Sequence, residues 1–450
     1  MIFRLAGHHE RVATQSAQWI AAARLVHRMG FGASGRVVDA VATQDPSAYV
    51  ASALATDPDA DPGAKATPVP MLAPPGRAPG RQAGTNARKA YNKELAAQMR
   101  TVSTWWINRM ATVDQPVHEK LTLLWHNHFA TSARKVRVAA LMAAQNQKIR
   151  THKLGDFRTL AYAMLTDAAM LRWLDGQQNT ARAANENLAR EFMELFALGH
   201  GNGYTEADVR EGARALTGWV IAPDGQTQVV PRRRDNESKT VLGVTGNLDA
   251  ASYCDAVLAR PESASFVAQR LWQQLVSDAP PSDAALGRSV AAYGPGRDLK
   301  ALTAAILTDP EFGGQLNSYV NTPVEWLIGL VRSLQIPLDT QKQTALVERT
   351  MEVLGQQPFY PPDVGGWPRG QAWLSTASAG ARLRAASALT KSADLSTVES
   401  VAPADRVDAA GYLLGIGAWT DRSAAVLRPL VKKPPALVAA AANTPENLTS

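Results

Sequence analysis

Apolar residues recur along most of the chain at the three- and four-residue spacing of one face of an α-helix. Residues 16–30 show this pattern first, and the glycine that ends the segment is typical of a helix C-terminus. Alanine-rich runs favour helix throughout, whereas alternating β-branched runs are short and few. The pattern therefore predicts a mainly α protein, built as a large multi-helix domain with a small β-hairpin insertion.

Composition divides the chain into three predicted segments. Residues 1–55 predict an N-terminal helical segment. Residues 56–86 are dense in proline, glycine and alanine, which predicts a flexible linker because little apolar surface is available to bury. Residues 87–450 predict the main helical domain. Within it, residues 219–246 hold a Pro-Asp-Gly turn between short β-prone runs, which predicts the hairpin.

One predicted helix, residues 185–198, carries a narrow polar strip on a mainly apolar surface. Asn187, Arg190, Glu191 and Glu194 fall at the steps that place helical side chains above one another. Arg190 can pair with Glu194, which leaves Glu191 to another partner. Burying carboxylates without partners is costly, so we expect both glutamates to be largely buried and bonded to arginine, histidine or backbone donors. A structural ion-pair network and a catalytic or metal-binding role both fit the strip.

Two further groups of polar residues accompany the strip. Asn185 is a reasonable N-cap, and helix N-terminal amides there could hold an anion. His126 and His128 lie two residues apart, so on a regular helix they point nearly opposite ways and cannot share one metal ion. They could converge only if the helix unwinds at Asn127. A satisfied structural role is the alternative for each histidine.

Charge and hydropathy narrow the classes of protein. Lys+Arg 47 against Asp+Glu 40 gives a net charge of +7, a mild bias that predicts no nucleic-acid partner. No apolar run approaches the roughly 18 residues needed to cross a bilayer, so we expect no membrane insertion. The single cysteine, Cys254, cannot form an internal disulfide. The start of the sequence as written has no signal-peptide pattern, so the expected location is cytoplasmic.

Four motifs, in order, carry a resemblance to a known family. They are LLWHNHFATS, NENLAREFMELFALGHGNGYTEADVREGARALTGW, SKTVLGVTGN and FYPPDVGGWPRGQAWLST. From about residue 21 to residue 390 the chain resembles the bacterial family catalogued as domain of unknown function 1800. The resemblance implies no established activity. It implies that relatives are often exported, which leaves the location open, and that they are often encoded beside a family resembling sulfatases, which would supply a sulfatase-like partner.

The resemblance also carries motif positions over to this sequence. They are His126, Asn127, His128, Asn185, Glu186, Asn187, Arg190, Glu191, Glu194, Trp219 and Trp367. Two positions depart from the family. Many relatives have histidine where Phe196 stands, and a His-Asp pair where this chain has Arg234 and Asp235. A site that used those histidines would be altered or absent here.

Two functions remain open from the sequence. The first is a hydrolytic enzyme acting on a polar polymer such as a polysaccharide, with Glu191 or Glu194 as acid/base and Arg190 holding one carboxylate ionised. His126 or His128 would be a second proton carrier or ligand. The residues expected to bind substrate are Asn185, Asn187, Trp219 and Trp367. The second function is a non-catalytic scaffold or accessory protein that acts with the sulfatase-like partner. The sequence identifies neither a cofactor nor a metal.

Overall fold

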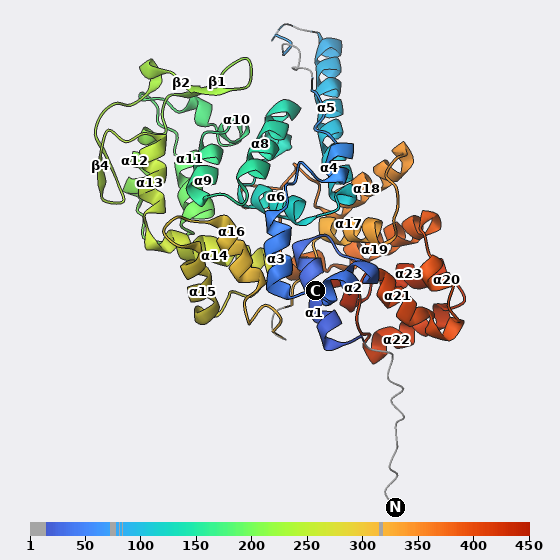
Figure 1. The fold of residues 1–450 in the computed structure, drawn as a ribbon. Helices are drawn as coiled ribbons and strands as arrows, with labels where there is room; N and C mark the ends of the chain where they lie inside the picture. Colours follow the sequence, from blue (N-terminus) through green and yellow to red (C-terminus); the bar gives the residue numbers. More distant parts are fainter. Residues whose placement is uncertain (1–14, 73–77, 81, 83, 315–317) are drawn as a thin grey trace, which may run out of the picture. The chain divides into compact units, whose positions relative to one another are not determined.

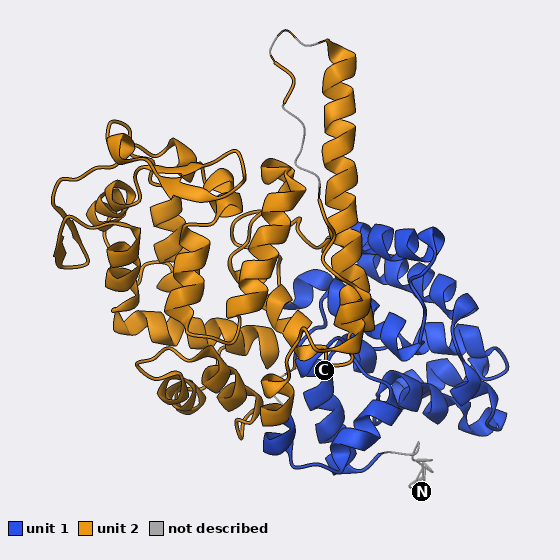
Figure 2. Ribbon diagram, turned by 45° about the horizontal axis from the view of Figure 1, so that its top comes forward, with its two compact units in different colours: residues 1–49, 319–354, 370–450 blue, residues 50–318, 355–369 orange. Residues whose placement is uncertain are grey.

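The computed structural model describes residues 15–72, 78–80, 82, 84–314 and 318–450. The fold is mainly helical, as predicted: the described residues form 24 α-helices and two small two-stranded antiparallel sheets (Figure 1). They divide into two compact units (Figure 2). Unit 1 comprises the described residues within 1–49, 319–354 and 370–450, and unit 2 those within 50–318 and 355–369. This division differs from the three segments expected from composition, because each unit joins stretches that are distant in sequence.

Unit 1 is built from helices at both ends of the chain. Its helices are α1 (Ala17–Met29), α2 (Gly35–Ala42), the first part of α3 (Pro46–Ala55), α17 (Pro323–Ser333), α18 (Gln341–Leu354), α19 (Thr376–Leu389), α20 (Ser396–Glu399), α21 (Arg406–Leu414), α22 (Asp421–Leu427), α23 (Pro434–Ala441) and α24 (Pro445–Leu448). The predicted helix at residues 16–30 is confirmed as α1. Ser16 caps it by accepting a hydrogen bond from the Trp19 N–H. Trp19 and Val26 then pack with Val38 of α2 in one apolar cluster.

Unit 2 contains the predicted polar strip and both motif histidines. Its helices are α4 (Pro62–Ala66), α5 (Thr85–Thr112), α6 (Val117–His128), α7 (Ala133–Val136), α8 (Ala139–His152), α9 (Phe157–Leu165), α10 (Ala168–Trp173), α11 (Asn187–Glu191), the π-helix η2 (Phe192–Ala197), α12 (Glu206–Ala215), α13 (Ala250–Leu258), α14 (Pro261–Leu275), α15 (Asp283–Tyr293) and α16 (Leu299–Leu307). Helix α6 is buried along its whole length apart from the partly buried Asn127. It contacts α5, α8 and α14, so the helix is enclosed on several sides together with its polar side chains.

The predicted hairpin insertion forms two antiparallel hairpins. Strand β1 (Trp219–Ile221) pairs with β2 (Thr227–Val229) around the predicted Pro-Asp-Gly turn. Strand β3 (Lys239–Val241) pairs with β4 (Val244–Gly246) across a two-residue turn, in which Leu242 and Gly243 have φ values of 51° and 85°. Positive φ at both turn positions matches the right-handed twist of the strands, and glycine adopts it without strain.

Within the segment 56–86, expected to be a flexible linker, residues 62–66 form the packed helix α4, while residues 73–77, 81 and 83 lie outside the described residues. Helix α4 begins after Asp61, whose carboxylate accepts a hydrogen bond from the Gly63 N–H at 2.8 Å. The same carboxylate accepts from the N–H groups of Asp114 and Gln115 between α5 and α6, at 3.2 and 2.9 Å. Backbone donors therefore hold a segment that has little apolar surface to bury. Composition did not reveal this, because it reports side-chain burial and not backbone pairing.

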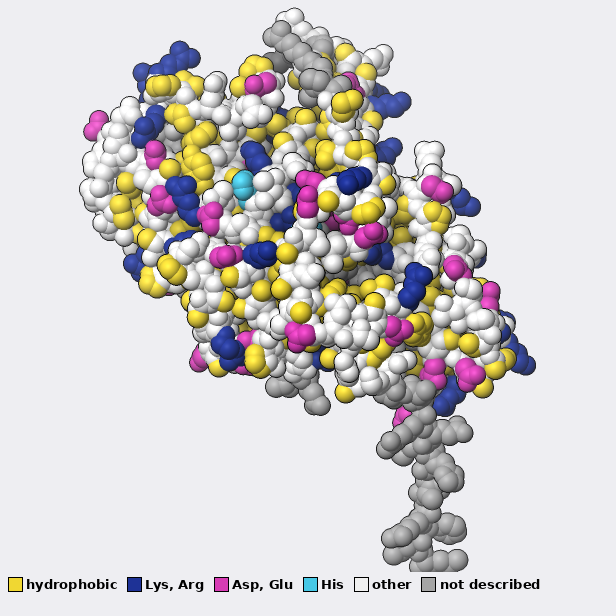
Figure 3. Space-filling model, viewed as in Figure 1, with side chains coloured by type: hydrophobic (Ala, Val, Ile, Leu, Met, Phe, Trp, Pro, Cys, Tyr) yellow, Lys and Arg dark blue, Asp and Glu magenta, His cyan; other side chains and the backbone are white. Residues whose placement is uncertain are grey.

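Charged side chains of both signs are interspersed over the face shown in Figure 3. This distribution agrees with the mild net charge of +7. Among the described residues, the exposed large apolar side chains are Val37, Val69, Met71, Val229, Val244, Val353, Leu374, Leu383 and Val426. No described helix combines the length and apolar character that crossing a membrane requires.

Gly63 tests the packing of α4. A Cβ added there would lie 2.2 Å from the backbone oxygen of Thr112, and only a shift of α4 or of the end of α5 could relieve that contact. We expect Gly63→Ala to lower the free energy of unfolding by about 1–3 kcal/mol, as overpacking does. Gly80→Ala is the matched control, since its Cβ meets no described atom within 4 Å. It should change stability by less than about 0.5 kcal/mol in chemical denaturation. Equal effects of the two variants would mean that α4 is not packed.

Candidate functional site

The polar strip predicted at residues 185–198 lies on two kinds of helix. Helix α11 runs directly into the π-helix η2, where the Leu198 N–H bonds to the carbonyl of Met193, five residues back. A π-helix has a longer repeat than an α-helix, so it interrupts the regular face expected from the sequence. The apolar side is buried as predicted, with Phe192 and Phe196 among the buried residues.

Glu191 and Glu194 are only partly buried, which corrects the expectation that both lie in the interior. The Glu194 side chain is 18% exposed, and its carboxylate lies 3.6 Å from Arg190 Nη1 and 3.5 Å from Nδ1 of His200. The carboxylate of Glu191 makes no hydrogen bond to any residue that the structure describes. Burial raises the pKa of Glu191, and the neighbouring Glu194 raises it further. The strip is therefore a solvent-accessible carboxylate pair in which one member lacks a hydrogen-bonded partner.

Arg190 is held by several carboxylates. It donates to both oxygens of Glu206 at 2.7 and 2.8 Å, and to Glu186 at 2.9 Å. The bidentate contact with Glu206 is the strongest of these, since a guanidinium fork matches a carboxylate. These hydrogen bonds raise the pKa of Arg190. The partner predicted from sequence, Glu194, is thus a longer contact than Glu206, which begins the next helix of the chain and was not expected to pair.

The two motif histidines are fully buried and lie in different aromatic clusters. The ring of His126 packs against three aromatic residues, which are Trp106, Phe359 and Trp367 at centroid distances of 5.4, 5.4 and 5.6 Å. The ring of His128 lies with its Nε2 2.9 Å from the carbonyl oxygen of Phe196. Burial lowers the pKa of each to about 3, so both rings are neutral at neutral pH. Neither ring contacts Glu191 or Glu194 among the described hydrogen bonds and ring contacts.

The four residues expected to bind substrate lie in different settings. Trp367 is buried, and its backbone N–H donates to Asn127 Oδ1 at 2.7 Å, which fixes the loop 355–369 to the end of α6. Asn185 was predicted to be the N-cap, but the N-cap residue of α11 is Glu186. The Asn185 side chain instead accepts a hydrogen bond from the Asn187 N–H at 3.0 Å, just before the helix. The Asn187 side chain is exposed, and Trp219 is partly buried at the start of β1.

The most deeply buried charged cluster surrounds Glu119 of α6, which sequence reasoning missed. Its carboxylate accepts from Arg109 Nε and Trp106 Nε1, both at 2.9 Å, and pairs with Arg150. Burial alone would raise the pKa of Glu119, but Arg150 and Arg109 together lower it below its ordinary value. Lys153 donates to the Arg150 carbonyl at 2.6 Å, and burial lowers its pKa to about 8. The sequence offered no clear signal, because Glu119 stands among several other polar residues of α6.

A pocket of about 340 Å³ adjoins this cluster. His118 and Glu119 line it from α6, and Asp57 and Asp61 line it from the segment before α4. Its volume lies within the range of small-molecule sites. His118 Nε2 is 2.9 Å from Thr56 Oγ1, and burial lowers the pKa of His118 to about 4. The oxygens of Glu119 and Asp61 are already bonded within the protein, so much of the polar wall serves the fold.

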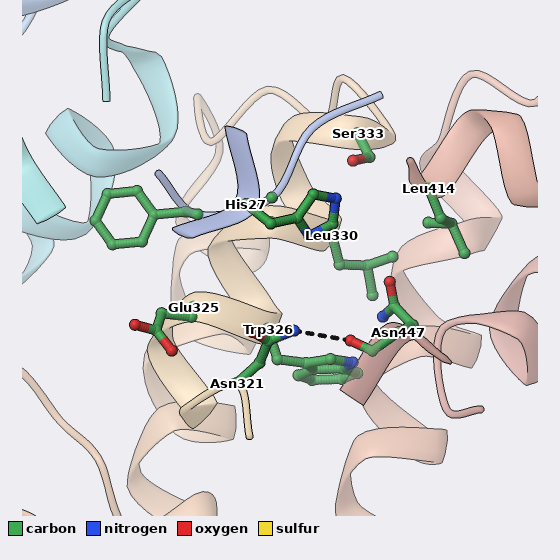
Figure 4. Close-up of a pocket in the computed structure, with 11 residues that line it drawn as sticks. His27, Asn321, Glu325, Trp326, Leu330, Ser333, Leu414 and Asn447 are labelled. Atoms are coloured by element: carbon green, nitrogen blue, oxygen red, sulfur yellow. Dashed lines mark hydrogen bonds between the residues drawn. The ribbon is translucent and has the colours of Figure 1, made fainter. Parts of the chain in front are cut away.

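Unit 1 contains a smaller pocket of about 20 Å³ (Figure 4). His27, Glu325 and Trp326 help to line it, and the Nδ2 group of Asn321 donates to the carbonyl of Asn447 at 2.9 Å. A space of this size admits a water molecule but no organic substrate. Across the residues described in both units, no group of three or more His, Cys, Asp or Glu is arranged to hold a metal ion.

The chain belongs to the family described as "Protein of unknown function (DUF1800)", whose family model matches residues 24–448. This match confirms the resemblance that the four ordered motifs carry. No curated protein and no solved structure matches the chain. Family membership therefore assigns no activity, and a function has to be argued from the arrangement of the residues.

Glu119→Gln tests the buried ion cluster. The substitution leaves Arg109 and Arg150 buried beside a neutral amide, and removing one partner of a buried pair costs about 3–5 kcal/mol. We expect a loss of that order in the free energy of unfolding at pH 7, measured by chemical denaturation. Asp255→Asn is the control, because it breaks the exposed pair with Arg158 and should cost less than about 1 kcal/mol. Similar small costs for both variants would rule out the cluster as a principal support of unit 2.

The buried histidines should make stability depend on pH. An unfolded histidine takes up a proton near pH 6.5, roughly, whereas the folded pKa values of His126 and His128 are about 3. The stability that the two neutral rings contribute is fully present above pH 6.5. It is lost as the pH falls toward 3, because the unfolded state then binds more protons than the folded state. Each lowers the free energy of unfolding by up to about 1.4 kcal/mol per pH unit.

His126→Phe keeps an aromatic ring but removes the titration. Denaturation at a series of pH values below 6.5 should therefore show a shallower loss of stability than in the wild type. His200→Gln, which changes a side chain that is 86% exposed, is the control and should leave the slope unchanged. An unaltered slope in His126→Phe would contradict a neutral, buried His126.

Proposed function

We propose that the protein is a hydrolase in which Glu191 donates a proton to the leaving group. The supporting observation is a partly buried carboxyl that has no hydrogen-bonded partner in the described part of the chain, and whose pKa is raised by burial and by the adjacent Glu194. A carboxyl group that retains its proton closer to neutral pH is the kind of group that general acid catalysis requires. Two neighbouring carboxyl groups in different environments commonly divide the roles of acid and base.

Glu194 is the second carboxylate in this proposal. The Nη1 atom of Arg190 lies 3.6 Å from its carboxylate. As the scissile bond breaks, the proton of Glu191 passes to the leaving-group oxygen, and Glu194 takes a proton from the water that adds to the other product. Proton exchange with solvent then restores both groups. His126 and His128 have no part in this scheme, because both are buried in aromatic surroundings.

A polar polymer such as a polysaccharide is the substrate class that we propose. The strip borders solvent, so a chain could lie across it without entering a closed cavity. The exposed Asn187 can hydrogen-bond hydroxyl groups at the start of α11, and the partly buried Trp219 offers an aromatic surface. Trp367 is left out of the binding surface, since its side chain is only 3% exposed.

A non-catalytic scaffold or accessory protein, acting with a sulfatase-like partner, is the second candidate. The observation that favours it is the engagement of other motif residues in packing: His126 and Trp367 contact each other, and Asn127 anchors the loop 355–369. Residues that hold a fold together can mark a family without taking part in chemistry. In this case Glu191 would lie on a binding surface, and the purified protein would hydrolyse nothing.

Glu191→Gln separates the two candidates. In the enzyme it should lower kcat on a cleavable polysaccharide by at least about 100-fold, which is the usual contribution of a general acid. Stability should stay within about 1 kcal/mol of the wild type, because the carboxyl is partly exposed and the repulsion from Glu194 is screened by solvent. The assays are release of reducing ends from a panel of neutral and acidic polysaccharides, and chemical denaturation.

Glu237→Gln is the matched control, since it neutralises an exposed glutamate away from the strip and should retain activity. If the wild type cleaves a member of the panel and Glu191→Gln cleaves it equally well, Glu191 is not the proton donor. A wild type that cleaves no member, yet binds a purified sulfatase-like protein through the surface around Glu191, would favour the scaffold.

A further inference from the structure

Arg270 of α14 is a partly buried cation for which the described residues supply no carboxylate partner. Its Nε atom is buried without a hydrogen-bond partner in the described part of the chain. By contrast, the buried arginines Arg109 and Arg150 of unit 2 both pair with Glu119. A guanidinium removed from water without a counter-charge is costly, so a fold that keeps one there has a reason outside its own packing.

A second cation lies close to Arg270. Arg369 is exposed in the loop 355–369, and its guanidinium bonds to Gln273 of α14. Burial, and then repulsion from Arg369, lower the pKa of Arg270 to about 10, so both guanidinium groups still carry their charge at neutral pH. The charge of Arg270 also acts on His128 at the end of α6, where it adds to the effect of burial in lowering the pKa of that ring. Two like charges are thus held together at one place in unit 2.

Gln274 adds an unused donor to the same region. Only 9% of Gln274 is exposed, and its Oε1 accepts a hydrogen bond from Asn127 Nδ2 at 3.4 Å. Its Nε2 group is buried and has no partner among the described residues. Because Arg270 and Gln274 are four residues apart on α14, their side chains lie on the same face of the helix. The face therefore presents donors and positive charge without matching acceptors.

We propose that Arg270, Arg369 and the side-chain amide of Gln274 form a binding site for a small ligand that carries an oxyanion, such as a sulfate, phosphate or carboxylate group. Such a group accepts several hydrogen bonds at once and neutralises both guanidinium groups. Asn127 positions the Gln274 amide by holding its oxygen, and Gln273 holds Arg369. The site does not involve Glu191 or hydrolysis, so this proposal can be tested independently of the proposed enzyme activity.

Thermal unfolding in sodium sulfate and in sodium phosphate tests this site, with sodium chloride at matched ionic strength to remove screening effects. The melting temperature of the wild type should rise with oxyanion concentration and then saturate, as it does when a ligand binds only the folded state. Arg270→Met should raise the half-saturating concentration by at least about tenfold, since it removes a charge-assisted hydrogen-bond donor. Arg210→Met, which removes an exposed arginine of α12, is the matched control and should respond as the wild type does.

Sulfate stabilises many proteins without binding them, so the comparison between variants decides the result. An equal, non-saturating response of the wild type, Arg270→Met and Arg210→Met would overturn the proposal. Arg369→Met supplies a second variant that keeps α14 intact, and it too should weaken the saturable response. Without oxyanion, Arg270→Met should melt at or above the temperature of the wild type, because it removes an uncompensated charge. A much lower melting temperature would show that Arg270 supports the fold, and would count against a binding role.

Discussion

The pairing of Glu119 with Arg109 and Arg150 is the interaction on which unit 2 depends. It joins three helices, α5, α6 and α8, through side chains that are all buried, and Trp106 completes the hydrogen bonding of the carboxylate. Charges in such a place repay their desolvation only when every partner is present. The cluster therefore fixes how the three helices meet, and α6 is then positioned to carry His126 and His128 into their separate aromatic clusters.

The polar strip of α11 and η2 differs from this cluster in its burial and in the pairing of its charges. Glu191 and Glu194 lie where α11 passes into the π-helix η2, at the border of unit 2 with solvent. Partial burial raises the pKa of Glu191, whose carboxylate has no hydrogen-bonded partner among the described residues. Glu119, by contrast, is fully buried and pairs with two arginines. A fold can accept a weakly compensated carboxyl at its surface, because solvent screens the cost. That contrast is why the strip, and not the interior cluster, supports a proposal of acid/base chemistry.

The loop 355–369 acts on both Glu191 and Arg270, the two charged residues for which the described residues supply no ion-pair partner of their own. Asp363 of this loop acts electrostatically on Glu191, and Arg369 of the same loop acts on Arg270. Trp367 and Asn127 anchor the loop between these points. The family motif that includes Trp367 thus has a physical meaning, because the backbone N–H of a buried tryptophan holds the loop from which Asp363 acts on Glu191 and Arg369 acts on Arg270.

The sequence alone determined what depends on near neighbours in the chain. Apolar spacing predicted the helical fold and the helix at residues 16–30, and the Pro-Asp-Gly turn predicted a hairpin, because each of these features is set within a few residues. The ordered motifs also identified the family. Tertiary structure alone decided which charges meet, since Glu119 pairs across 31 residues with Arg150 and Arg190 pairs across 16 with Glu206. It also decided that Glu191 borders solvent and that residues 62–66 are packed, because burial and backbone pairing depend on segments that only folding brings together.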